Sequence, residues 1–183
     1  REPIYGIRPD LVAKYPSHDD QKSRWRLPIL YKSLQQKNID DKVHEKFPLI
    51  MTSGRLVEYE GGGEETRSNK WLAELQQDMF IEINPKAAND RGIRDGEYVW
   101  VKTPTGAQLK VKALVTERVG AGTSFIPFHF SGWWQGKDML EYYPDGAHPL
   151  VRGEAVNTAT TYGYDAVTMM QETKTTLCQV AKA

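Results

Sequence analysis

The segment from Asn84 to Thr123 constrains the fold most, because it places several turn signals between short apolar runs. Asn84-Pro85 is a capped helix start, since asparagine accepts hydrogen bonds from free helix amides and proline suits the first turn. Asp95-Gly96, Pro104-Thr105-Gly106 and Gly120-Ala121-Gly122 mark tight turns. This order predicts a strand, one short helix and three further strands, which together build a compact barrel.

The predicted fold is mainly β with short helices. Tyr98–Val101 is apolar at each position, which favours burial on both faces, whereas Leu109–Val115 alternates as a half-buried strand does. Gly92 is expected to end the short helix, and Trp71–Leu75 to form a further helical turn. The other expected elements are strands at Phe47–Thr52, Met79–Ile83, Ser124–Phe130 and Thr175–Val180, and a structured loop at Ser131–Val156.

Charge and cysteine content exclude several classes of protein. The 183 residues contain 24 Lys+Arg and 24 Asp+Glu, so the formal net charge is zero. Bulk attraction to nucleic acid or to an acidic membrane is therefore not expected, and no apolar run is long enough to insert into a bilayer. Cys178 is the single cysteine, which rules out an internal disulfide and a Cys-x-x-Cys metal motif. Its apolar neighbours indicate a core residue rather than a nucleophile.

Residues 1–46 are expected to form an arm that precedes the barrel domain at residues 47–183. Several prolines interrupt the arm, but Tyr5, Tyr15, Trp25 and Tyr31 supply apolar area worth burying, and a helix is expected at about Ile29–Lys37. The chain opens on Arg1-Glu2-Pro3 rather than on methionine, which suggests a processed chain or a piece of a longer one.

Two segments beside the barrel have residues suited to an anion. Thr52-Ser53-Gly54-Arg55 lets backbone amides approach a ligand and adds a guanidinium that matches phosphate oxygens; the alternative is a plain turn with a surface arginine. Gly61-Gly62-Gly63 with Thr66-Arg67 could cradle phosphate, although it lacks the ending of a P-loop; the alternative is a flexible linker.

No catalytic or metal-binding spacing stands out. His129 lies between Phe128 and Phe130 in an apolar strand, where a satisfied core histidine is the commoner outcome. Asn157 and the threonines after it, with Gln171 and Lys174, could hydrogen-bond a heterocycle or could be only a polar loop. A domain of this kind is more suited to binding a cofactor than to performing a reaction.

These residues resemble the C-terminal domain of molybdopterin oxidoreductases of the DMSO reductase family, and most of all that of formate dehydrogenase catalytic subunits. The likeness covers residues 47–183. It is carried by the runs Phe47–Arg55, Thr66-Arg67, Trp71-Leu72, Ile83-Asn84-Pro85, Gly92–Gly96, Pro127–Phe130, Asn157 and Glu172-Thr173-Lys174. The runs Glu58–Gly63 and Thr160–Asp165 resemble the bacterial respiratory type.

The resemblance implies a six-stranded double-psi β-barrel and a ligand, molybdopterin guanine dinucleotide carrying Mo or W. It places Ser53, Gly54 and Arg55 on the pterin or pyrophosphate side and Thr66 and Arg67 in the following ligand loop. Phe128 and His129 would line the pterin, and Asn157, Tyr162 and Lys174 would complete its polar cover. Many relatives have a histidine in the glycine loop where this chain has none, so the glutamates of that loop are not carried over as ligands.

The resemblance also implies a parent enzyme. The family's metal ligand, active-site residues and iron–sulfur cysteines have no match here, so the isolated chain is expected to be inactive. The parent would oxidise formate to CO2 and pass electrons to an iron–sulfur subunit and a membrane cytochrome b. The domain would contact the remainder of the catalytic subunit, in the periplasm or alternatively in the cytoplasm. Alternatives are a nitrate, thiosulfate or arsenate reductase, or a double-psi barrel module of an ATPase.

Overall fold

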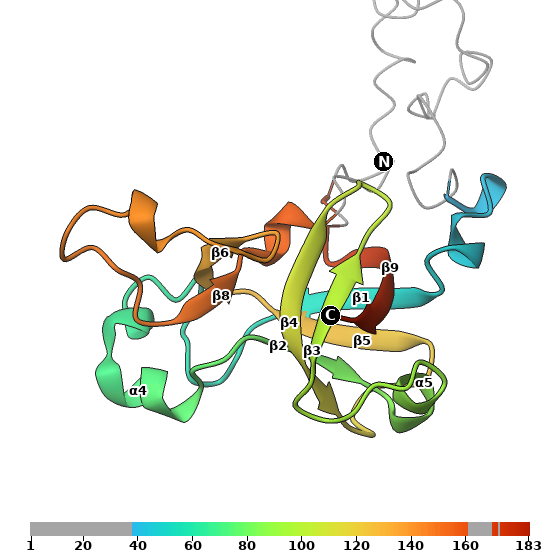
Figure 1. The fold of residues 1–183 in the computed structure, drawn as a ribbon, viewed down its shortest axis with the longest axis horizontal. Coiled ribbons are helices and arrows are strands. Elements are labelled where there is room, and N and C mark those ends of the chain that lie inside the picture. The colour runs from blue at the N-terminus through green and yellow to red at the C-terminus, as the bar shows by residue number, and fades with distance from the viewer. Residues whose placement is uncertain (1–37, 161–169, 172) are drawn as a thin grey trace, which may run out of the picture. The chain divides into compact units, whose positions relative to one another are not determined.

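A computed structural model describes residues 38–160, 170, 171 and 173–183 (Figure 1). The described residues from Lys42 onward, other than residues 170 and 171, belong to one compact unit. The helix predicted at Ile29–Lys37 lies outside the described residues. The predicted domain boundary between residues 46 and 47 remains a prediction.

Six strands of this unit close into a barrel in the order β1-β5-β2-β4-β3-β9, which confirms the predicted fold class. Two neighbouring pairs, β1–β5 and β2–β4, are parallel, and the other four are antiparallel. The strands are β1 (Leu49–Gly54), β2 (Phe80–Ile83), β3 (Tyr98–Lys102), β4 (Gln108–Val115), β5 (Thr123–Pro127) and β9 (Thr175–Lys182).

Aliphatic side chains fill the barrel. Alternate residues of β4 point inward, so that Leu109, Val111 and Ala113 are buried while Lys110 and Lys112 are partly exposed. β3 contributes in the same way, whereas in β2 three consecutive residues, Ile81, Glu82 and Ile83, are all buried. Since each fully buried aliphatic side chain is worth roughly 1.5–3 kcal/mol, this interior provides most of the stability of the barrel.

The prediction that β3 is buried on both faces is wrong. Val99 and Val101 are fully buried, but Tyr98 is 45% exposed and Trp100 is half-buried. The outer face of β3 is open to solvent, and the Lys110 ammonium lies 5.5 Å from the Tyr98 ring centroid and 5.9 Å from that of Trp100. Aromatic rings that contact a lysine ammonium are stable in a partly exposed position. An apolar run such as this one therefore does not require a strand that is buried on both faces.

The short helix α5 (Pro85–Asn89) begins and ends as predicted. The Asn84 side chain accepts a hydrogen bond from the Lys86 amide at 3.0 Å, and Pro85 occupies the first turn. At the other end, Gly92 has φ 64° and the Ile93 amide donates to the Ala88 carbonyl oxygen at 2.9 Å. This is the glycine-terminated arrangement that satisfies the last carbonyl groups of a helix.

The remaining helices are short. α4 (Lys70–Leu75) confirms the predicted helical turn, and the Asn69 side chain caps it by accepting from the Trp71 and Leu72 amides at 3.0 and 3.3 Å. The 3₁₀ turns are η2 (Val43–Glu45), η3 (Thr66–Ser68), η4 (Leu140–Tyr142) and η5 (Val156–Thr158).

The structured loop predicted at Ser131–Val156 instead contains a small sheet. Its order is β7-β6-β8, with β6 (Ser131–Trp134) parallel to β8 (Arg152–Glu154) and antiparallel to β7 (Lys137–Asp138). These strands are two to four residues long. They are too short to show the alternation on which the prediction of strands depends.

Glu154 joins this sheet to the barrel. Its side chain is 1% exposed. One carboxylate oxygen, Oε1, accepts hydrogen bonds from the backbone amides of Lys110 in β4, at 3.0 Å, and of Gly136. The other, Oε2, accepts from the Gln135 amide at 2.8 Å. Three oriented amides thus replace the water that a buried carboxylate loses.

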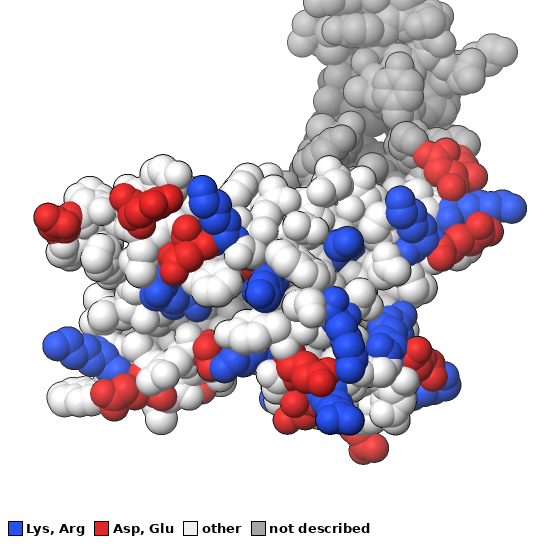
Figure 2. All heavy atoms as spheres, in the orientation of Figure 1, with Lys and Arg blue, Asp and Glu red and all other residues white. Residues whose placement is uncertain are grey.

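The visible face carries interspersed charges of both signs (Figure 2), in keeping with the net charge of zero. Among the described residues, no helix has the length and apolar character needed to cross a membrane.

Cys178 is a core residue, as predicted. It is fully buried in β9, and this burial raises the pKa of its thiol to about 12. Since the thiolate is the reacting form, the native chain is expected to resist a maleimide at pH 7.5 by at least about a hundredfold relative to the urea-unfolded chain. Labelling followed by mass spectrometry measures both rates. Equal rates in the folded and unfolded chains would contradict this assignment.

Candidate functional site

The two segments predicted to hold an anion leave the barrel side by side. β1 and β5 are parallel neighbours, with Ser53 opposite Ile126 and Gly54 opposite Pro127. Just beyond this register, the Phe128 amide donates to the Gly54 carbonyl oxygen at 3.2 Å. The carboxyl ends of both strands therefore deliver their following loops to one edge of the barrel.

β5 ends earlier than predicted. The strand stops at Pro127, so Phe128, His129 and Phe130 follow it rather than belong to it. His129 has φ 105°, a left-handed conformation that a strand does not allow and that non-glycine residues rarely adopt. The apolar run concealed this turn, because its side chains are buried after the strand as well as within it.

Two cations flank the ring of Phe128. The Arg55 guanidinium carbon lies 5.7 Å and the Lys174 ammonium 5.8 Å from the ring centroid. The structure thus brings together Arg55, Phe128 and Lys174, which lie far apart in the sequence. Among the described residues, no carboxylate forms an ion pair with either cation. Within the described part of the chain, both charges are therefore available to an external anion.

The loop formed by residues 55–67, hereafter the 55–67 loop, is held by its own hydrogen bonds. The Arg55 Nε–H donates to the Gly61 carbonyl oxygen at 3.1 Å, and the Thr66 hydroxyl oxygen accepts from the Glu60 amide at 3.0 Å. The Arg67 Nε–H donates to the Gly63 carbonyl oxygen at 3.0 Å. Thr66 and Arg67 therefore support the loop in this structure.

Tyr59 anchors the 55–67 loop and was not singled out as a functional residue by the sequence. Its side chain is 1% exposed, and its hydroxyl donates to the Gln76 carbonyl oxygen at 2.6 Å. Burial, assisted by the nearby Glu58 carboxylate, raises the pKa of the Tyr59 hydroxyl. The sequence signal for this anchoring role is that Tyr59 is a single aromatic residue within a run of glycines and glutamates.

His129 is buried beneath the 55–67 loop. It is 4% exposed, and its ring centroid lies 5.4 Å from that of Tyr59 and 4.4 Å from that of Phe128. Burial is the main cause that lowers the pKa of the His129 imidazole, and the nearby Arg67 and Arg55 add to it. The sequence prediction of a buried histidine is correct, although its place in a strand is not.

Two further predicted residues, Ser53 and Asn157, have few contacts among the described residues. The Ser53 hydroxyl oxygen is buried and has no hydrogen-bond partner among the described residues. Asn157 is exposed in η5, where its carbonyl oxygen accepts from the Thr160 hydroxyl at 3.2 Å. Tyr162 lies outside the described residues. The roles of all ten predicted site residues remain predictions.

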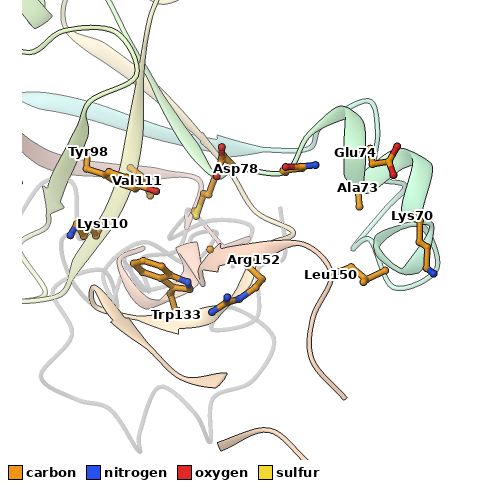
Figure 3. A pocket seen from close by; sticks show the side chains of 13 residues that line it. Lys70, Ala73, Glu74, Asp78, Tyr98, Lys110, Val111, Trp133, Leu150 and Arg152 are labelled. Atoms are coloured by element: carbon orange, nitrogen blue, oxygen red, sulfur yellow. The ribbon is translucent and has the colours of Figure 1, made fainter. Parts of the chain in front are cut away.

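The grooves on the described part of the domain include only some of these residues. A groove of about 460 Å³ lies between α4, the barrel and the small sheet. Figure 3 shows Lys110 and Tyr98 approaching it from the barrel, and Lys70 and Glu74 from α4. Arg55 borders a second groove of about 490 Å³, and Arg67 a third of about 240 Å³.

The described part of the chain contains no group of three or more His, Cys, Asp or Glu side chains placed to hold a metal ion. The cation pair around an aromatic ring instead suits a ligand that combines negative charge with a flat ring system.

Comparison with known proteins identifies the class. Residues 49–177 match the family model described as "Molydopterin dinucleotide binding domain". The match covers more than half of the chain, so the chain belongs to this family, as its resemblance implied. A cofactor-binding domain is supported over an ATPase module.

Several of the similar curated proteins are formate dehydrogenase alpha subunits. The chain is 32% identical over 149 residues to the F420-dependent formate dehydrogenase 2 subunit alpha of Methanococcus maripaludis, covering 81% of this chain and 19% of that protein. It is 28% identical over 166 residues to the formate dehydrogenase subunit alpha of Megalodesulfovibrio gigas, covering 91% and 15%. The chain thus spans less than a fifth of the length of these relatives.

A solved structure has the same fold. Acetylene hydratase from Pelobacter acetylenicus superposes with a TM-score of 0.63 over 90% of this chain and 22% of its own, at 19% sequence identity. Such an identity supports the barrel architecture and leaves the reaction open.

Proposed function

We propose that this domain holds molybdopterin guanine dinucleotide in the alpha subunit of a formate dehydrogenase. The observation that carries the proposal is the placement of Arg55 and Lys174 around Phe128, at the carboxyl ends of β1 and β5. Family membership supports the cofactor class, and the similar alpha subunits support the reaction.

The geometry suits the two chemical parts of a dinucleotide. Arg55 and Lys174 would bind oxygens of the pyrophosphate, for which a guanidinium fork and an ammonium are the usual partners. Phe128 would contact a flat heterocycle through its ring. The positive charges of Arg55 and Lys174 would then lie beside the pyrophosphate, which links the two ring systems of the dinucleotide.

Three other predicted residues would fit such a ligand. The buried Ser53 hydroxyl lacks an acceptor among the described residues and lies one residue from Gly54, where the β1 backbone leaves the barrel. A bound ligand atom would supply that acceptor and remove the cost of leaving a buried donor unpaired. Asn157 and Tyr162 would add polar contacts to the heterocycle.

When bound, the cofactor supplies the molybdenum or tungsten centre at which two-electron chemistry takes place. This chain's own residues would bind and orient the cofactor and surround it with fixed hydrogen-bond donors, which tune a metal centre from outside its ligand shell. The isolated domain would be inactive, because the residues that act on substrate would lie elsewhere in the parent subunit.

The wider assembly follows from the same proposal. A formate dehydrogenase alpha subunit would oxidise formate to CO2 and pass electrons to an iron–sulfur subunit and a cytochrome b. The bacterial respiratory type would place this domain in the periplasm, with the cytoplasm as the alternative. Neither nucleic acid nor insertion of this domain into the membrane forms part of the proposal.

The test uses the full-length subunit that carries this domain. Acid release of its cofactor should yield guanine nucleotide together with molybdenum or tungsten, measured by chromatography and mass spectrometry. The enzyme should reduce an artificial dye with formate, and reduced dye should not be oxidised at a comparable rate by nitrate, thiosulfate or arsenate. Absence of guanine nucleotide would overturn the cofactor, and preference for one of the three oxidants would overturn the reaction.

A further inference from the structure

His129 contacts both ends of the 55–67 loop. Its imidazole Nε2 accepts a hydrogen bond from the Leu56 amide at 3.3 Å, at the start of the loop. Its backbone carbonyl oxygen accepts from the Arg67 guanidinium at 3.0 Å, at the end of the loop. One residue therefore ties together two positions that are eleven apart in the sequence, on either side of the glycine run.

The backbone of His129 makes the second of these contacts possible. At φ 105° the residue adopts a left-handed backbone conformation, which is strained for a residue that has a side chain. Such strain persists where the surroundings compensate for it. Here the compensation is specific, because the turned carbonyl group meets Arg67 while the ring remains beneath the loop.

The contact with Leu56 also defines the state of the ring. An acceptor nitrogen carries no proton, so the neutral imidazole has its hydrogen on Nδ1. Nδ1 is buried beside Gly63 and has no hydrogen-bond partner among the described residues. A proton on Nε2 would place two donors against each other at the Leu56 amide.

Gly63 permits the close approach of the loop to this ring. A Cβ built at Gly63 would lie 2.9 Å from His129 Nδ1 and 3.0 Å from Arg67 Cγ, and the residue has φ 82°. The glycine at this position is thus explained by packing on His129 and Arg67, rather than by flexibility of a linker.

We propose that His129 is a positioning residue that fixes the 55–67 loop at both ends and faces this loop rather than the cofactor. It holds Leu56 through Nε2 of its neutral Nδ1–H tautomer and Arg67 through its backbone carbonyl oxygen. The role in cofactor binding rests on the proposed function, since Arg55 and Thr66 belong to the fixed loop. His129 would then act on the cofactor only through the residues that it positions.

Acid is expected to release the loop. The charged groups around the ring are the cations Arg55 and Arg67, which oppose a second proton, and the Glu64 carboxylate, which favours it. Burial outweighs the carboxylate, so the folded-state pKa of His129 lies below its value of 6.5 in an unfolded chain. The stabilisation is therefore complete above pH 6.5 and is lost as the pH falls through the lowered value.

The first experiment uses the 183-residue chain with ¹⁵N-labelled histidine and backbone. At pH 7.5 the imidazole spectrum should show His129 as the Nδ1–H tautomer, and the Leu56 amide should exchange at least about tenfold more slowly than an unstructured amide. His129→Leu should remove this protection, His129→Gln should retain most of it because its amide oxygen can accept, and the exposed-site control His44→Gln should leave it intact. An Nε2–H tautomer, or equal protection in the leucine and glutamine variants, would overturn the proposal.

The pH dependence and Gly63 provide readouts that do not depend on the leucine variant folding. Between pH 7.5 and 5.5 the Leu56 protection factor should fall in the wild-type chain and remain constant in His129→Gln. Gly63→Ala should lower the Leu56 protection factor at both pH values. A wild-type protection factor that does not change with pH would contradict the neutral-ring requirement.

The second experiment uses the full-length subunit and separates this proposal from the proposed function. Cofactor content should fall about fivefold or more in His129→Leu and recover in His129→Gln. A loss in both variants would assign His129 as a direct contact and overturn its positioning role. If cofactor content were also unchanged in Arg55→Glu while Leu56 protection followed the pattern above, the proposed cofactor site would be wrong and the role of His129 in the loop would stand.

Discussion

Replacing Glu154 by leucine is expected to lower the free energy of unfolding of the chain by on the order of 4 kcal/mol. Leucine approximates the volume of the side chain but accepts no hydrogen bond. The amides of Lys110, Gln135 and Gly136 would then lose their acceptor in part-buried positions, and a donor left unpaired by burial costs about 1–3 kcal/mol. Few single surface changes on this chain should have a comparable effect.

The glutamine variant should show an intermediate loss of stability. In Glu154→Gln one oxygen still accepts two of the three bonds, while the new amide group opposes the third donor. A loss of roughly half that of the leucine variant is expected. The exposed-site control Glu141→Gln should change stability by less than about 0.5 kcal/mol.

Urea unfolding followed by tryptophan fluorescence measures all three variants. The small sheet contains Trp133 and Trp134, so its release from the barrel should also appear as an early transition in Glu154→Leu. Equal stability of the leucine variant and the wild-type chain would show that Glu154 does not join the sheet to the barrel.

Reversing both charges around Phe128 is expected to have the largest functional effect. In the full-length subunit, Arg55→Glu with Lys174→Glu should reduce bound guanine nucleotide and metal by at least about tenfold, since each decade of affinity corresponds to about 1.4 kcal/mol. Two cations would become two anions beside the proposed position of the pyrophosphate.

The matched control reverses two exposed cations that are not among those beside the Phe128 ring. Arg94→Glu with Lys102→Glu makes the same change in net charge, and both side chains are exposed. Cofactor content should then remain within about twofold of the wild-type value. Equal losses in the two double variants would indicate a general effect of charge rather than a site at Phe128.

The barrel could be predicted from the sequence because its signals are local. Asn84, Gly92 and Gly96 determine caps and turns through their own backbone requirements, and the β4 alternation reports a single buried face. The strands predicted from these signals differ from the observed ones by a few residues.

What the sequence could not show depends on distant contacts or on very short elements. β6, β7 and β8 are too short for periodicity, and Glu154 gains its partners from three other segments. The turn at His129 was hidden because Phe130 continues the apolar run beyond β5.

The site was predicted more through resemblance than through pattern. Taken by themselves, Arg55 and Lys174 are surface cations in polar loops, and no local rule places them on one ring. Parallel pairing of β1 with β5 and the antiparallel β9 beside β1 bring them together. That arrangement depends on how the strands pair in the closed barrel, and this pairing cannot be predicted from each segment taken separately.

The most direct test of the cofactor site is the position of the cofactor in a structure of the loaded, full-length subunit. We predict that its pyrophosphate oxygens contact Arg55 or Lys174 and that one of its ring systems lies on Phe128, with His129 behind the 55–67 loop. A cofactor bound instead in the groove between α4 and the small sheet, with Arg55 and Lys174 free, would contradict the account.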